Sequence, residues 1–209
     1  MKHLIFDIDG TLWDTTEVVA KAWNKALNEA GRDVLCNLFI TGEMLKKEFG
    51  KPMNIIADDL FGDIDDKIKA EILKVSCKYE HEAILENNED LTFEGVRETL
   101  KELSLNNKLY IVSNCQDGYV ELVMKKNGFE DIIEDFECYG HTGLYKAENI
   151  KLLMERNNIK EAFYIGDTLG DFEASKEAGV KFIFAAYGFG EVKNPDYRIE
   201  KIEELLSLF

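Results

Sequence analysis

The sequence predicts an α/β fold, with a Rossmann-like parallel sheet as the core and an all-helical cap domain inserted after the first strand. After about residue 88, short apolar segments with strand character alternate with helical patterns. Strands that alternate with helices form parallel sheets with right-handed crossovers. Between the first strand and residue 88 only helical patterns occur, and such a block is expected to form a second small domain. We therefore assign residues 1–13 and 90–209 to the core and residues 14–89 to the cap.

The first expected elements are a short buried strand over Leu4–Phe6 and the helix that follows it. Asp14 is the expected N-cap of this helix, Glu17 occupies the capping-box position, and Gly31 ends the helix. The other cap helices are expected at Gly42–Phe49, Met53–Leu60 and Asp65–Leu85. The core is expected to add strands over Leu109–Val112, Phe136–Tyr139, Phe163–Ile165 and Val180–Ala185, and helices over Glu94–Leu103, Gly118–Asn127, Ala147–Arg156, Phe172–Ala178 and Ile202–Leu208.

The composition excludes several classes of partner and of location. The chain of 209 residues carries 41 acidic and 25 basic residues, a formal net charge of −16. Such a surface repels nucleic-acid phosphates and anionic lipids, so we expect no nucleic acid and no membrane as partner. No segment approaches the roughly 20 apolar residues of a membrane-spanning helix, and acids follow the N-terminus too closely for a signal peptide. The cysteines form no C-x-x-C pair, which indicates reduced thiols and a cytoplasmic location; they are Cys36, Cys77, Cys115 and Cys138.

The first strand ends in two carboxylates, Asp7 and Asp9, followed at once by Gly10 and Thr11. Buried strands rarely carry acids, because an unpaired carboxylate in a dry interior lowers the stability of the fold by several kcal/mol. At the carboxyl end of a strand, however, such acids lie in the crevice where open α/β sheets bind ligands. A divalent cation between them would offset their repulsion. The structural alternative is an acidic turn in which Gly10 supplies a positive φ.

Three later segments place polar residues in the same strand context. Ser113 and Asn114 follow an apolar strand and could donate to a phosphoryl oxygen, or form a polar turn. Lys146 begins a helix, where a cation opposes the helix dipole unless it faces an anion; otherwise it is an ordinary solvated lysine. Asp167 directly follows a strand, and Asp171 could either join the same site or cap the next helix.

The order and strand context of these residues resemble the haloacid dehalogenase-like (HAD) hydrolase superfamily, in its phosphoglycolate phosphatase and β-phosphoglucomutase-like branch with a helical cap. The first motif of that superfamily, Asp-x-Asp-Gly-Thr, matches residues 7–11. Its second motif, a Ser or Thr after an apolar strand, matches Ser113, and its third, a lysine, matches Lys146. Its fourth, Gly-Asp-x-x-x-Asp, matches residues 166–171, so the resemblance covers the whole chain.

The resemblance implies a role for each matched residue. Asp7 would be the nucleophile, and Asp9 would protonate the leaving group and then deprotonate the hydrolytic water. Mg²⁺ would be held by the Asp7 side chain, the Asp9 backbone carbonyl and Asp167. Asp171 would orient Lys146 or a metal-bound water. The residues expected to contact the phosphoryl group are Gly10, Thr11, Ser113, Asn114 and Lys146.

The implied activity is a Mg²⁺-dependent phosphatase that acts on a small phosphorylated metabolite, such as phosphoglycolate, through an aspartyl-phosphate. A phosphosugar mutase is disfavoured, because Val19 stands where such mutases carry a histidine. A receiver-like phosphoacceptor or binding module is disfavoured by Asp9 and by the cap. The cap lysines Lys46, Lys47 and Lys51 could contact substrate or form a solvated helix face. Trp13 is expected to alter loop shape without touching the chemistry, and the chain to be a monomer or a homodimer.

Overall fold

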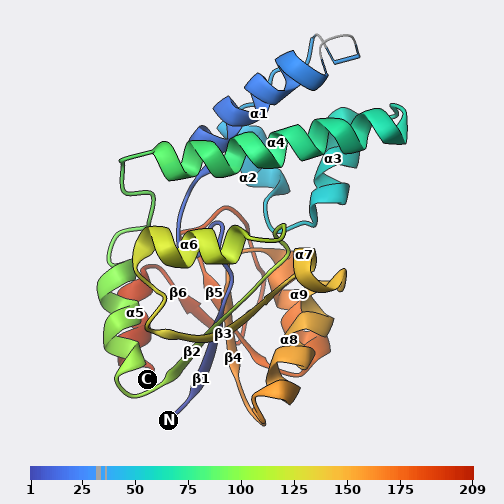
Figure 1. Ribbon diagram of the computed structural model, residues 1–209. Helices are drawn as coiled ribbons and strands as arrows, with labels where there is room; N and C mark the ends of the chain where they lie inside the picture. Colours follow the sequence, from blue (N-terminus) through green and yellow to red (C-terminus); the bar gives the residue numbers. More distant parts are fainter. Residues whose placement is uncertain (32–33, 36) are drawn as a thin grey trace.

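The computed structural model describes residues 1–31, 34–35 and 37–209, so the predicted thiol of Cys36 lies outside the described residues. Six strands form a parallel sheet in the order β3-β2-β1-β4-β5-β6 (Figure 1). This confirms the α/β, Rossmann-like fold. The strands are β1 (His3–Phe6), β2 (Lys108–Ser113), β3 (Ile133–Cys138), β4 (Phe163–Gly166), β5 (Lys181–Ala185) and β6 (Tyr197–Ile199).

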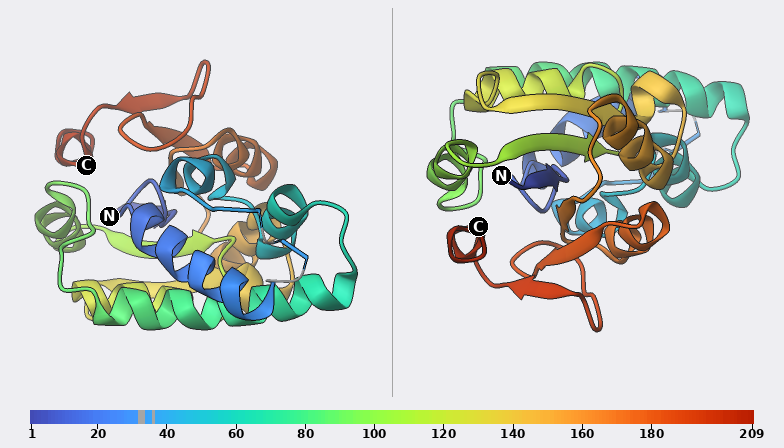
Figure 2. Two further views of the ribbon diagram at one scale, coloured as in Figure 1. Left: turned by 90° about the horizontal axis from the view of Figure 1, so that it is seen from above. Right: turned by 90° about the horizontal axis from the view of Figure 1, so that it is seen from below.

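Helices cover both faces of the sheet, and β1 shows why. Leu4 and Phe6 pack on one side and Ile5 on the other, and none of them is exposed to solvent. Side chains alternate along a strand, so a central strand with apolar residues throughout must be covered on both faces. In Figure 2, seen from below, α5 and η1 lie on one side of the sheet and α8 and α9 on the other. The elements of the core are α5 (Val96–Ser104), α6 (Tyr119–Asn127), α7 (Tyr139–Thr142), α8 (Lys146–Arg156), α9 (Leu169–Ala178) and the 3₁₀ helix η1 (Ile202–Ser207).

The remaining helices lie beyond the carboxyl ends of the strands (Figure 1). They are α1 (Thr16–Ala30), α2 (Gly42–Glu48), α3 (Met53–Phe61) and α4 (Asp66–Glu86). The two chain segments that lead to and from this helical block run side by side, since Asp14 N–H donates to Leu91 O (2.9 Å) and Phe93 N–H to Leu12 O (3.1 Å). The division into core and cap at residues 14 and 89 stays a prediction. Among the described residues, no helix combines the length and the apolar character that crossing a membrane requires.

Several boundaries differ from those the sequence predicts. The residue before α1 is Thr15, so the expected Asp14–Glu17 capping box is wrong; Asp14 Oδ1 instead accepts from the N–H (3.0 Å) and the hydroxyl (2.6 Å) of Thr16. The C-terminal helix is a 3₁₀ helix and not an α-helix. β3 begins three residues earlier than predicted, and two of its acids, Asp135 and Glu137, pair with Arg156. Both β6, of three residues, and α7, of four residues, are too short for a periodic signal.

Candidate active site

Three carboxylates and one lysine converge at the carboxyl edge of the central strands. Asp7 follows β1, Asp167 follows β4, Asp171 lies in the first turn of α9, and Lys146 is the first residue of α8. Lys146 Nζ lies 2.9 Å from Asp7 Oδ1 and 2.5 Å from Asp171 Oδ1. All four residues are buried, with Lys146 only 3% exposed. The single ammonium therefore pairs with two of the three buried carboxylates, those of Asp7 and Asp171.

The electrostatics of this cluster follow from its burial. Burial raises the pKa of Asp7 to about 6, against the opposing effect of Lys146. Burial, followed by repulsion from Asp171 and Asp7, raises the pKa of Asp167 well above its usual range. Burial alone would lower the pKa of Lys146, but Asp171 and Asp7 outweigh it and raise that pKa. The lysine is thus held in its charged form, while the acids carry unrelieved repulsion.

The donor set fits a hard divalent cation. Carboxylate oxygens of Asp7, Asp167 and Asp171 lie within 4.8 Å of one another. Asp7 Oδ2 is buried and accepts no hydrogen bond within the described part of the chain. Asp171 is already engaged, since its Oδ1 accepts from Lys146 and its Oδ2 from the N–H (2.9 Å) and the hydroxyl (2.7 Å) of Thr168. Oxygen ligands of this kind suit Mg²⁺. Asp7 Oδ2 is the oxygen that such an ion would satisfy, because it is buried and accepts no hydrogen bond from the described residues.

Asp171 satisfies both interpretations that its sequence position allows. It forms a reciprocal capping box with Thr168 at the start of α9, and it also binds Lys146. The capping box fixes the Asp171 carboxylate, because Thr168 holds one oxygen while the other accepts from Lys146. By capping α9, Asp171 is therefore held in the position from which it orients the Lys146 ammonium.

Gly10 allows Asp167 to approach the first loop. Its φ is +81°, and a Cβ at this position would lie 2.2 Å from Asp167 Oδ2. Asp167 is held there by Phe189 N–H, which donates to Oδ2 (2.8 Å), and by the hydroxyl of Thr11, which donates to Oδ1 (3.3 Å). The N–H groups of Gly10 and Thr11 donate within the loop, to Trp13 O (2.9 Å) and Ile8 O (3.1 Å). Neither amide is directed at a ligand in this conformation.

We expect Gly10→Ala to destabilise the protein more than Gly179→Ala. Gly179 has a similar φ of +76°, but nothing lies within 4 Å of a Cβ built there. Gly179→Ala therefore measures the backbone strain alone, a loss of about 1 kcal/mol in the free energy of unfolding. Gly10→Ala adds the clash with Asp167, for a loss of about 2 kcal/mol or more. Urea denaturation measures both values, and equal losses would contradict the close approach of Asp167.

The Asp9 side chain is bound by residues outside this cluster. Its Oδ1 accepts from Trp13 Nε1 (2.9 Å), from the Tyr119 hydroxyl (2.8 Å) and from the Thr15 hydroxyl (3.3 Å). Trp13, which the sequence predicts to leave the chemistry untouched, thus contacts a predicted site residue. Burial raises the pKa of Asp9 to about 8, repulsion from Asp7 and Glu80 adds to this shift, and the hydrogen bond from Tyr119 opposes it.

Asp9 opens onto a small cavity between the core and helices α2 to α4. We call it the Asp9 cavity; its volume is about 20 Å³, and its polar lining is Asp9, Lys51, Glu80, Ser113, Asn114, Gln116 and Tyr119. The predicted residues Ser113 and Asn114 thus meet Asp9 here. Of the three cap lysines, Lys51 lines this cavity, Lys46 pairs with Glu43 (2.9 Å), and Lys47 is exposed. Cys115 also lines it, as a buried thiol.

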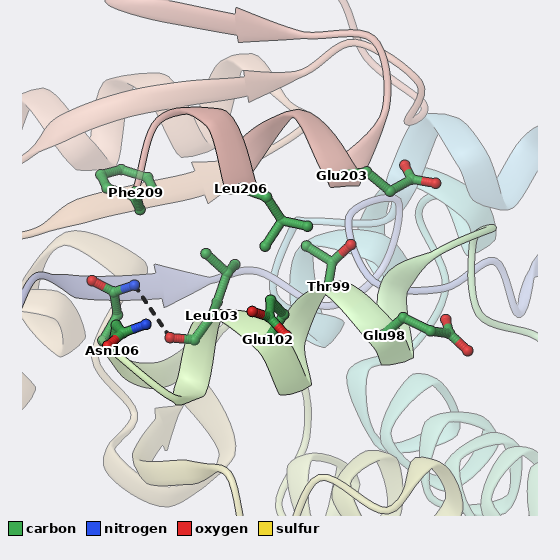
Figure 3. A pocket seen from close by; sticks show the side chains of 9 residues that line it. Glu98, Thr99, Glu102, Leu103, Asn106, Glu203, Leu206 and Phe209 are labelled. Carbon is green, nitrogen blue, oxygen red and sulfur yellow. Dashed lines mark hydrogen bonds between the residues drawn. The ribbon is translucent and has the colours of Figure 1, made fainter.

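A larger cavity lies elsewhere, between α5 and η1, with a volume of about 600 Å³ (Figure 3). The titratable residues that line it are Glu98, Glu102 and Glu203. It has no basic side chain in its lining, and it lacks the mixed acid and lysine chemistry of the Asp7 cluster. The candidate site is therefore identified by its buried acids and lysine, and not by the size of a cavity.

Sequence reasoning missed several residues that hold the site together. Thr168 could have been found, because a threonine three residues before an acid at a helix start is a capping-box signal. Tyr119 and Phe189 carry no such local signal, because each acts through a contact between segments far apart in the chain. Thr15 lies only six residues after Asp9, but no recognised motif marks their contact.

Comparison with known proteins agrees with this geometry. The family model of haloacid dehalogenase-like hydrolases matches residues 4–185. The chain is 27% identical over 217 residues to a phosphoglycolate phosphatase of Aquifex aeolicus, covering 100% of this chain and 96% of the relative. It is also 27% identical over 217 residues to the pyrophosphatase PpaX of Bacillus velezensis, with coverages of 98% and 94%. A haloacid dehalogenase-like family hydrolase of Streptococcus pneumoniae has the same fold, with a TM-score of 0.84, 22% identity, and coverages of 100% and 98%. The chain therefore belongs to the haloacid dehalogenase-like hydrolase family.

Proposed function

We propose that this protein is a Mg²⁺-dependent phosphatase that hydrolyses a small phosphorylated metabolite through an aspartyl-phosphate. The observation that carries the proposal is the buried Asp7, whose Oδ1 binds Lys146 while its Oδ2 lacks a partner among the described residues. The relatives named above are a phosphoglycolate phosphatase and a pyrophosphatase. Both names fit an enzyme that attacks phosphorus in a small anion.

Asp7 is the proposed nucleophile. An oxygen of its carboxylate would attack phosphorus as the bond from phosphorus to the leaving oxygen breaks, and water would then release phosphate from the aspartyl group. Lys146 would keep the nucleophile oriented and would offset charge on the phosphoryl oxygens. Ser113, at the carboxyl end of β2, and the backbone N–H of Asn114 are proposed to contact those oxygens. Gly10 and Thr11 would join them only if their loop rearranged, since both amides are engaged.

Asp9 is the proposed acid and base, and its surroundings indicate which oxygen carries the proton. Three donors converge on Oδ1, whereas no hydrogen bond from the described residues reaches Oδ2. The proton of the neutral acid would therefore reside on Oδ2. From there it would pass to the leaving oxygen, and Oδ2 would later accept a proton from the attacking water.

Asp7 Oδ2 and Asp167 would hold Mg²⁺, with the Asp9 backbone carbonyl as the ligand that the family resemblance adds. The bound ion would supply positive charge that offsets the phosphoryl group and the surplus carboxylates. Asp171 would keep Lys146 in place, because its Oδ1 accepts from the ammonium while Thr168 holds its Oδ2. We also propose a cytoplasmic location, supported by the free thiols of Cys77, Cys115 and Cys138.

Metal removal tests this proposal. Phosphate release from a panel of small phosphate esters is expected to fall by at least about 100-fold in EDTA and to return with added Mg²⁺. Mg²⁺ should also raise the melting temperature of the protein without substrate, because it relieves repulsion among buried carboxylates. Turnover that persists in EDTA would contradict the metal dependence. Stable phosphorylation of the chain without phosphate release would favour the receiver-like alternative.

A further inference from the structure

The Asp9 cavity is where the leaving group of the proposed reaction would lie, so the inference below rests on the proposed phosphatase function. If Asp9 protonates the leaving oxygen, the rest of the leaving group extends from Asp9 into this cavity. The volume of about 20 Å³ holds about one water molecule, so a leaving group of several atoms enters only when the helices α2 to α4 move away from the core. The hydrogen-bonding groups and charges of its lining decide which leaving groups the cavity accepts.

Glu80 presents a buried carboxylate to the cavity from helix α4. It is 4% exposed, and no lysine, arginine or histidine of the described chain forms an ion pair with it. Its Oε2 accepts from Trp23 Nε1 (2.7 Å) and its Oε1 from Gln116 Nε2 (2.8 Å). A carboxylate oxygen accepts more than one hydrogen bond, so Glu80 retains capacity for a further donor.

Asn114 adds a second acceptor that lacks a donor. Its Nδ2 donates to Gly50 O (2.8 Å), which fixes the orientation of the amide, because the reversed amide would place two oxygens together. Its Oδ1 is buried and has no hydrogen-bond partner among the residues that the structure describes. Buried acceptors are normally satisfied, so this oxygen indicates a donor supplied from the cavity.

The one basic side chain in the cavity lining is already neutralised. The ammonium of Lys51 lies 2.7 Å from Glu48 Oε2 and 2.8 Å from Asp59 Oδ2. The cavity therefore offers two carboxyl groups, on Asp9 and Glu80, and an open amide oxygen, without a free cation in its described lining. An anionic leaving group would be repelled by the ionised Glu80 and would leave Asn114 Oδ1 without a donor, whereas a donor group would satisfy both.

We propose that the Asp9 cavity selects phosphate esters whose leaving group carries a hydroxyl or ammonium donor, and that Glu80 and Asn114 exclude esters whose leaving group is a carboxylate or a phosphate. Short phosphorylated diols and amino alcohols are the substrates of this class. Glycolate and phosphate, the leaving groups of phosphoglycolate and pyrophosphate, are the disfavoured ones. The specificity would thus differ from that named for the relatives, although the catalytic cluster would be shared.

The test compares three esters of nearly equal size: 2-hydroxyethyl phosphate, 2-aminoethyl phosphate and 2-phosphoglycolate. Burial raises the pKa of Glu80 and that of Asp9, so the three esters are compared at each point of a pH series, because selection by charge needs Glu80 ionised while proton donation needs Asp9 protonated. We expect kcat/KM for at least one of the two donor esters to exceed that for 2-phosphoglycolate by at least about tenfold. The relative kcat/KM of the two donor esters tells whether a neutral or a charged donor is preferred.

Glu80→Gln is the variant that separates charge from shape. The new amide oxygen can accept from Trp23, and the Gln116 amide can turn to accept from the new N–H, so both contacts survive. We expect kcat/KM for 2-phosphoglycolate to rise by about tenfold relative to 2-hydroxyethyl phosphate. Glu82→Gln, an exposed change on the same helix, should leave this ratio unchanged. An unchanged ratio in Glu80→Gln, or a wild type that prefers 2-phosphoglycolate, would overturn the proposal.

A binding measurement keeps this outcome separate from failure of the phosphatase proposal. If the wild type releases phosphate from no ester at all, the proposed function fails. Calorimetric titration of Asp7→Asn with each ester then decides the specificity on its own. Tighter binding of a donor ester than of 2-phosphoglycolate, lost in the Asp7→Asn, Glu80→Gln double variant, would support the selection by Glu80. Equal or reversed affinities would refute it.

Discussion

Asp7→Asn is expected to lower phosphate release by at least about 10³-fold, because the amide cannot attack phosphorus. The substitution preserves the size of the side chain, and its amide oxygen can still accept from Lys146 Nζ, now 2.9 Å from Asp7 Oδ1. Binding and orientation of substrate should therefore survive while covalent catalysis is lost. Initial rates with saturating Mg²⁺ measure the effect, and acid-quenched intact mass should show a phosphoryl group on the wild type only.

The same variant should unfold no more easily than the wild type. Burial and repulsion from Asp171 raise the pKa of Asp7, which means that its charge opposes folding. Replacing it with a neutral amide leaves Lys146 paired with Asp171 (2.5 Å) and removes one of three crowded carboxylates. Stability that is maintained or increased in metal-free buffer would show that the lost activity is chemical. Turnover within about tenfold of the wild type would contradict a nucleophilic role for Asp7.

The parts of the fold that could be predicted are those with strong local signals. β1 and β4 are short apolar runs that end in polar residues, and both lie at the centre of the sheet, buried on both faces. β3 was harder to locate, because Glu134, Asp135 and Glu137 interrupt its apolar pattern. Those charges are tolerated because β3 is an edge strand, and Arg156 from α8 lies 2.7 Å from both Asp135 Oδ2 and Glu137 Oε2.

The cluster of three acids and Lys146 could be predicted for a topological reason. In a parallel sheet the carboxyl ends of neighbouring strands meet at one edge, so residues that follow β1 and β4 must lie close together. The structure brings Asp7, Lys146, Asp167 and Asp171 together in this way. Their chemical roles stay predictions, because their proximity alone does not establish catalysis.

The other half of the site could not be predicted, because it depends on how the cap helices pack. Glu80 lies 36 positions from Gln116 and 57 from Trp23 along the chain, and within α4 it has the same sequence context as any charged residue of a long helix. Its burial follows from the packing of α4 on α1 and against the loop after β2. The residues proposed to set specificity are thus the ones with the weakest sequence signal, and the structure is needed to find them.

Lys146→Met is expected to lower the free energy of unfolding by about 3–5 kcal/mol and to abolish detectable phosphate release. Methionine fills the space of the lysine stem, so the change is one of charge. Asp7 and Asp171 would then remain buried without their shared cation, which lies 2.9 and 2.5 Å from them. Removing one partner of a buried ion pair costs more than the pair contributes, because the remaining charge has no solvent to stabilise it. Urea denaturation in metal-free buffer measures the loss.

Two comparisons identify the cause of that loss. Lys151→Met, on the same helix, removes a half-exposed ammonium 3.1 Å from Glu177, and should cost less than about 1 kcal/mol. The Lys146→Met, Asp7→Asn double variant should be more stable than Lys146→Met alone, because it removes one of the two stranded carboxylates. If Lys146→Met costs no more than Lys151→Met, or if Asp7→Asn adds its own loss without recovery, then the cation does not compensate these acids, and its place beside Asp7 would need another explanation.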